Sequence, residues 1–86
     1  MIRLLGTQTA CGTTTGAASN FGKSNAVRLF NGGTAVHLVT LEKADGTDIG
    51  TISINAKADV ILRKSPTDKI FAANAAVLGV PVGFHY

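Results

Sequence analysis

The chain has 86 residues, of which 45% are hydrophobic and 15% are charged, and its net charge is +3. This length fits one domain, and the charged fraction lies well below the roughly one quarter of an ordinary domain. The basic residues are scattered, which argues against specific nucleic-acid binding, and no apolar run approaches the ~18 residues that a membrane-spanning helix needs.

The first 24 residues differ in composition from the rest. From residue 6 to residue 25 nearly every position is Gly, Ala, Ser, Thr or Asn, and Cys11 and Phe21 are the isolated larger apolar side chains. Such a segment buries too little apolar surface to offset its own ordering entropy. We therefore predict an N-terminal arm over residues 1–24 that lies against another surface, and a domain over residues 25–86 that stays folded without the arm.

Strand patterns follow one another from residue 26 onward, with turn signals about every ten residues. The predicted strands cover residues 26–30, 35–42, 49–54, 59–63 and 76–84, with shorter ones at 2–5 and 8–11. Pro81 removes a backbone donor, which favours an edge or bulged position for the last strand, and residues 70–78 are the one weak candidate for a helix. The pattern predicts an all-β fold, a small antiparallel β-sandwich or barrel-like domain with an extended Gly/Thr/Ser-rich N-terminal arm.

Several predicted strands carry apolar side chains on both faces, although a two-sheet fold buries only one face of each sheet. Phe30, Val39, Leu41 and Ile61 each oppose other apolar residues of their own strand. Phe21 joins them as an isolated aromatic residue suited to anchor the arm in a neighbour's pocket. These five residues form the candidate interface. Because the core is small and Cys11 has no disulfide partner, we expect a homo-oligomer, with a trimer favoured.

Catalytic and metal-binding patterns are weak. Residues 17–24 fit a relaxed phosphate-binding loop with Ala in place of the first Gly, but such a loop must open a helix, and here a strand pattern follows. His37 and His85 lie far apart from one another and from Cys11, without paired-ligand spacing. We expect no catalytic residue, metal or cofactor, and therefore no enzyme.

The body of the chain resembles very short virion proteins of marine tailed bacteriophages, especially those that infect cyanobacteria. The resemblance rests on five motifs that occur in order along most of the chain: Met1 to Thr7, Cys11 to Thr13, Val27 to Asn31, Ile49 to Thr51, and Lys64 to Asp68 before a last apolar strand. It implies a β-sandwich structural component of the particle, such as a capsid decoration (cement) protein or a small head–tail or tail-associated protein. The family transfers no functional residues to this chain.

The expected function is therefore that of a non-enzymatic phage virion protein that decorates and stabilises the capsid as an oligomer. The expected partners are the major capsid protein or tail and neck proteins, with no nucleic acid and no membrane. Because no secretory signal is evident, we expect synthesis in the host cytoplasm before assembly into the virion. The alternative is a tail- or fibre-associated structural or receptor- or carbohydrate-binding module. Sugar-binding faces usually expose Trp or Tyr, whereas this chain has no Trp and one Tyr.

Overall fold

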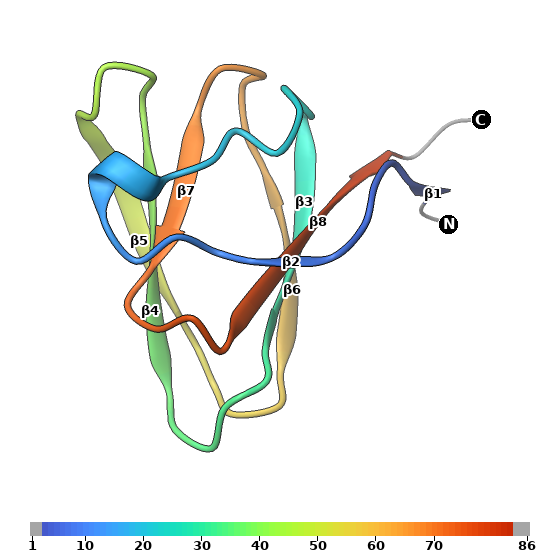
Figure 1. The fold of residues 1–86 in the computed structure, drawn as a ribbon, viewed down its shortest axis with the longest axis vertical. Coiled ribbons are helices and arrows are strands. Elements are labelled where there is room, and N and C mark those ends of the chain that lie inside the picture. The colour runs from blue at the N-terminus through green and yellow to red at the C-terminus, as the bar shows by residue number, and fades with distance from the viewer. Residues whose placement is uncertain (1–2, 84–86) are drawn as a thin grey trace.

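Two antiparallel sheets pack face to face, as the sequence predicted, in a computed structural model that describes residues 3–83. The strands are β1 (Arg3–Leu4), β2 (Thr9–Ala10), β3 (Ala26–Asn31), β4 (His37–Glu42), β5 (Asp48–Ile54), β6 (Asp59–Arg63), β7 (Lys69–Ala72) and β8 (Val77–Gly83), and a short 3-10 helix, η1 (Thr15–Ala17), follows β2. The larger sheet has the order β1-β8-β3-β6, with β2 also paired to β8, and the smaller sheet has the order β5-β4-β7 (Figure 1).

The strand β7 replaces the helix that was the weak alternative for residues 70–78. Ile70 and Ala72 are both fully buried and lie opposite Leu41 and Val39 of β4. Alanine favours a helix, but a four-residue segment gains more from pairing with β4 and burying every second side chain than from helix propensity. The helix candidate is therefore not realised at residues 69–72, in agreement with the predicted all-β fold, and the smaller sheet gains its third strand.

The last strand, β8, is also not an edge strand, because it pairs with β3 on one side and with β1 and β2 on the other. The oxygen of Pro81 accepts a hydrogen bond from Leu5 N (2.9 Å), so Pro81 directs its backbone toward the N-terminal segment. Because Leu5 stands opposite Pro81, the missing N–H of Pro81 faces the point where the N-terminal segment leaves β8, and the proline ring lies next to Gly6. The irregularity expected from the proline lies in the neighbouring segment.

The core fills the space between the sheets. Its buried members are Cys11, Phe21, Val27, Leu29, Val39, Ile54, Ile70, Ala72 and Val77. A second, smaller cluster of Ala26, Val80 and Val82 lies on the other face of the larger sheet, because these residues alternate with core residues along β3 and β8. The chain itself therefore covers part of the surplus of apolar side chains that the sequence shows.

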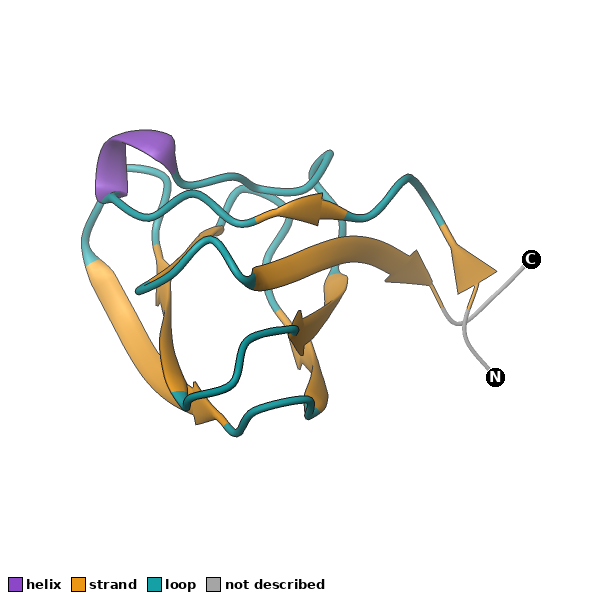
Figure 2. Cartoon of the chain, turned by 60° about the horizontal axis from the view of Figure 1, so that its bottom comes forward, coloured by secondary structure: helices purple, strands orange, loops and turns teal. Residues whose placement is uncertain are grey.

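The N-terminal segment, residues 3–24 and here called the arm, closes one side of the sandwich. Cys11 N donates to Val77 O of β8 (2.9 Å), and Ala72 N of β7 donates to Gly12 O (2.9 Å). Ser19 then forms an isolated bridge with Ile70 of β7. Figures 1 and 2 show the arm passing from β8 to the smaller sheet, where η1 lies. The arm thus joins the two sheets, and we expect its removal to destabilise the domain.

The packing of the arm also explains why position 79 in β8 is a glycine. A Cβ atom at Gly79 would lie 2.7 Å from the Phe21 ring and 3.3 Å from Leu29. Gly79→Ala should therefore lower the free energy of unfolding by about 1–3 kcal/mol, measured by urea denaturation. Gly16→Ala is the matched control, because its Cβ would have only Thr14 Oγ1 nearby, at 3.9 Å. Equal stability of the two variants would contradict the packing of Phe21 against β8.

Candidate functional site

The side of the sandwich opposite the arm is open. Within residues 3–83, β5 pairs with β4 alone and β6 pairs with β3 alone, so both are edge strands. The turn at residues 55–58 joins them, but they belong to different sheets (Figure 1). Beside β5 lies a groove of about 270 Å³ that is lined by Val39, Leu41, Gly50, Thr51, Ile52 and Leu62. We call the two edges and this groove the open side.

Large apolar side chains are exposed at the open side. Ile52 of β5 is 39% exposed beside the groove, and Ile49 and Ile61 are 48% and 41% exposed on β5 and β6. Single exposed apolar residues are ordinary, but here Ile52 lines a mainly apolar groove, and Ile49 and Ile61 are exposed on the two edge strands beside it. The open side is the candidate functional site because its exposed backbone edges and apolar side chains suit contact with another polypeptide.

The structure places two of the five predicted interface residues in the core and leaves the other three accessible. Phe21 and Val39 are buried in the core, where the chain's own residues cover them, so the prediction that a partner covers them is corrected. Phe21 was misassigned because an isolated aromatic residue in a small-residue segment shows no sign of the cavity beside Gly79 that it fills. Val39 was misassigned because alternation defines two faces of a strand but does not say which face is inside.

The other three predicted residues remain accessible. Leu41 is half-buried and lines the groove, Ile61 lies on β6, and Phe30 lies half-buried on the outer face of the larger sheet. The guanidinium carbon of Arg28 lies 5.6 Å from the centre of the Phe30 ring, a cation–π distance. Of these three residues, Leu41 and Ile61 belong to the open side, where the buried Val39 also lines the groove. Ile52, which the interface prediction omitted, is more central to it.

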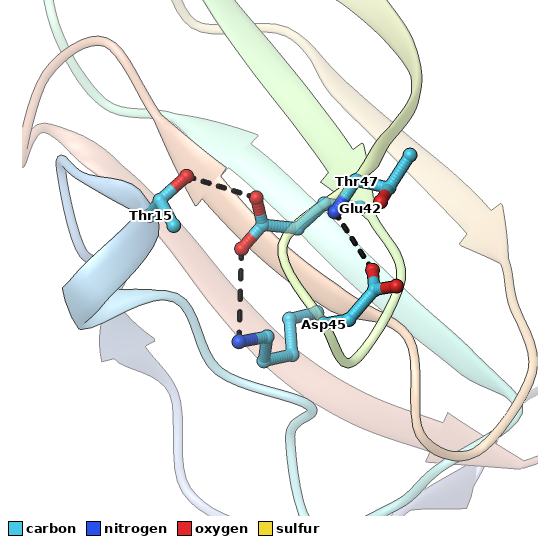
Figure 3. Close-up of polar contacts among 5 residues, drawn as sticks. Thr15, Glu42, Asp45 and Thr47 are labelled. Atoms are coloured by element: carbon cyan, nitrogen blue, oxygen red, sulfur yellow. Dashed lines mark hydrogen bonds and ion pairs between the residues drawn. The ribbon is translucent and has the colours of Figure 1, made fainter.

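A buried carboxylate fastens the arm to the smaller sheet (Figure 3). Glu42 Oε2 accepts a hydrogen bond from Thr15 Oγ1 (3.0 Å), and Oε1 lies 3.9 Å from Lys69 Nζ, an ion pair too long for a hydrogen bond. In the neighbouring turn, the backbone N–H of Thr47 donates to Asp45 (2.9 Å) and lowers the pKa of that carboxyl. These contacts explain the polar residues at this end of the sheet by local structure.

The phosphate-loop match also has a structural explanation. Phe21, Gly22 and Lys23 all adopt positive φ angles, which turn the chain so that Phe21 enters the core. The following residues form β3 from Ala26 onward, so the match does not open a helix N-terminus. Ser24 is buried and its carbonyl accepts a hydrogen bond from Lys64 Nζ (2.8 Å). Burial lowers the pKa of Lys64.

The histidines and the cysteine, which were considered as catalytic or metal-binding residues, lie in different parts of the fold. His37 lies on β4 and Cys11 is buried in the core as part of the arm, while His85 lies outside the described residues. In the described part of the chain, no group of three His, Cys, Asp or Glu side chains is placed to hold a metal ion. Among residues 3–83, no helix is long and apolar enough to cross a membrane.

Burial raises the pKa of the Cys11 thiol from 9.0 to about 11. Between these values the folded state keeps a proton that the unfolded state releases, so the stability from the neutral thiol is complete below about pH 9 and is lost as the pH rises through 11. The stability advantage of the wild type over Cys11→Ala should shrink by about 2–3 kcal/mol across this range. Urea denaturation of both proteins at each pH checks it, because all other titrating groups are shared. A constant difference would contradict the buried, neutral thiol.

Comparisons with protein-family models, with curated proteins and with solved structures give no match for this chain.

Proposed function

We propose that the chain is a structural protein of a tailed-phage virion, a capsid decoration protein that binds the shell as an oligomer and acts without catalysis. The observation that carries the assembly part of this proposal is the open side, where two edge strands adjoin an apolar groove in the described chain. The virion part rests on the resemblance of the sequence motifs to short phage virion proteins. The proposed partner on the particle is the major capsid protein, or a tail or neck protein if the chain sits there.

The shape of the domain supports a role in contact with other chains. Its arm is already used within the molecule, on β7 and β8, so the open side is the part whose backbone edges remain for others. Exposed strand edges provide main-chain hydrogen bonds, and neighbouring apolar grooves provide side-chain specificity. A protein that stabilises a lattice needs both kinds of contact at subunit boundaries.

Binding to the particle tests the proposal. Shells of the encoding phage, stripped of this chain, should recover it on mixing, and cosedimentation measures the recovered amount. Cryo-electron microscopy of the reloaded shell should place the domain at regular positions on the outer surface. Saturable binding with one site per lattice position supports decoration. A chain that binds no shell, neck or tail but binds a specific glycan on an array would replace this proposal by the carbohydrate-binding alternative.

A further inference from the structure

The edge of β5 offers a template for another strand. β5 has seven residues, of which the first six are exposed, and its pairing with β4 is regular from Ile54 to Gly50. Natural edges are usually guarded by Pro, Lys or a bulge that interrupts the strand. β5 contains neither Pro nor Lys, and its irregularity is confined to the start, near Ile49. By contrast, the shorter edge strand β6 carries the charged residues Asp59 and Arg63 at its ends.

Gly50 makes this edge unusual. A glycine inside a strand weakens it and often marks a β-bulge or the close approach of a ligand or another backbone. Gly50 is not among the residues with positive φ, and a Cβ atom added there would have no heavy atom within 4 Å. Gly50 borders the β-bulge at Ile49, but the bulge does not hold Gly50 at a positive φ, so neither the backbone nor a neighbouring atom requires a glycine at this position. Its missing side chain leaves a hollow in the groove between Leu41 and Ile52.

We propose that two copies of this chain pair through their β5 edges, antiparallel and about a two-fold axis at Thr51. In this register, Ile52 of each copy stands opposite Gly50 of the other, because both residues lie one position from the axis. Each isoleucine then fills the hollow beside the opposite glycine. Centring the pair on Ile52 or on Gly50 would instead place two isoleucines or two glycines side by side and lose this fit.

The charges near β5 agree with a two-fold antiparallel pair. The single charged residue of β5 is Asp48, at its start, while Lys57 lies in the turn after its end; both are exposed, and Lys57 Nζ also donates a hydrogen bond to Gly32 O of its own chain. Antiparallel pairing brings the start of one strand to the end of the other. The acidic end of each copy therefore meets the turn that carries Lys57 of the other, and the two Asp48 carboxylates stay apart.

The proposed occupant of the open side is thus a second copy of this chain. The inference rests on the proposed function only in treating the open side as an assembly surface. It joins the two smaller sheets into one continuous sheet with β5 next to β5 at its centre. The contact is the same patch on both copies and closes on itself. The proposed assembly is therefore a dimer, whereas the sequence favoured a trimer.

Disulfide trapping tests the register. Residues facing each other across an antiparallel pair have Cα atoms about 4.5–5.5 Å apart, within the range of a disulfide. Thr51→Cys should therefore form a covalent dimer under mild oxidation. Ser53→Cys is the matched control, because it lies on the same face of the same strand but its two copies would be ~13 Å apart. The native Cys11 is buried and contributes little reactive thiolate.

The expected yield of covalent dimer is about tenfold higher for Thr51→Cys than for Ser53→Cys. Equal yields, or no cross-linking at position 51, overturn the two-fold pair.

Sedimentation equilibrium provides a second measurement. The wild-type chain should dimerise, and Ile52→Lys should raise the dissociation constant about 10- to 100-fold because it removes the side chain that fills the hollow. Leu38→Lys is the control, because Leu38 is similarly exposed (44%) but lies on the inner strand β4. Circular dichroism should show that both variants fold. A wild type that stays monomeric at every concentration, or equal weakening by both variants, overturns the inference.

The purified chain alone suffices for both experiments, so their outcome separates this inference from the proposed function. If the chain dimerises but binds no part of the particle, the β5 pairing is supported and the proposed virion role is overturned. Monomers that bind the shell would overturn the β5 pairing and keep the virion role.

Discussion

Deletion of residues 1–24 is expected to abolish cooperative folding of the chain. The deletion removes Cys11 and Phe21 from the core, and burial of two such side chains contributes about 3–6 kcal/mol. It also leaves Val77 O and Ala72 N without the hydrogen bonds from the arm. Small domains have only about 5–15 kcal/mol of stability in total, and this one is at the small end of the range of sizes. Thermal melting followed by circular dichroism measures the loss.

A shorter deletion is the control for this experiment. Removing residues 1–5 takes away β1, whose Leu4 is exposed, together with the exposed Leu5, but leaves Cys11 and Phe21 in place. That variant should melt cooperatively, slightly below the full chain. If the chain lacking residues 1–24 melts as cooperatively as the full chain, the domain boundary predicted at residue 24 from composition is correct and the arm is a passive extension.

The arm shows where prediction from this sequence reaches its limit. Its composition correctly indicates few core-forming side chains, and the structure contains only Cys11 and Phe21 of the arm in the core. Composition carries no information about backbone pairing, however, and main-chain hydrogen bonds to β7 and β8 hold the arm in place. Small residues suit such a role because they let the backbone approach closely. At Gly12, a Cβ atom would overlap the Ala17 carbonyl.

The strands themselves were more predictable than their roles. Alternation and turn residues placed β3, β5 and β6 within one residue of their observed bounds. By contrast, β7 was missed because its four residues are too few to show a period. The edge position of β5 depends on which strands become neighbours, and that is a property of the whole fold. The importance of Gly50 and Ile52 therefore emerged only when β5 was seen at the edge of its sheet.

One polar residue in the core connects these elements. Asn31 ends β3 and is completely buried. Its Nδ2 donates to the carbonyl oxygens of Ala35 and Ile54, both at 2.8 Å, and its Oδ1 accepts from Gly33 N at 2.9 Å. The side chain therefore links the larger sheet, the loop before β4 and the end of β5. Because all three bonds are made, burial of this amide carries no unpaired group.

Asn31→Ala should lower the free energy of unfolding by about 3–5 kcal/mol, because it leaves two carbonyls and one N–H without their partner in the interior. In a domain of this size, the melting temperature should fall by about 15 °C or more. Asn31→Asp should be equally harmful, because a carboxylate still accepts from Gly33 but cannot donate to Ala35 and Ile54. Asn55→Ala, at an exposed position in the turn after β5, is the control and should melt near the wild type. Differential scanning calorimetry of the four proteins makes the comparison. Similar melting of Asn31→Ala and Asn55→Ala would show that the amide is not needed to fasten β5 to β3.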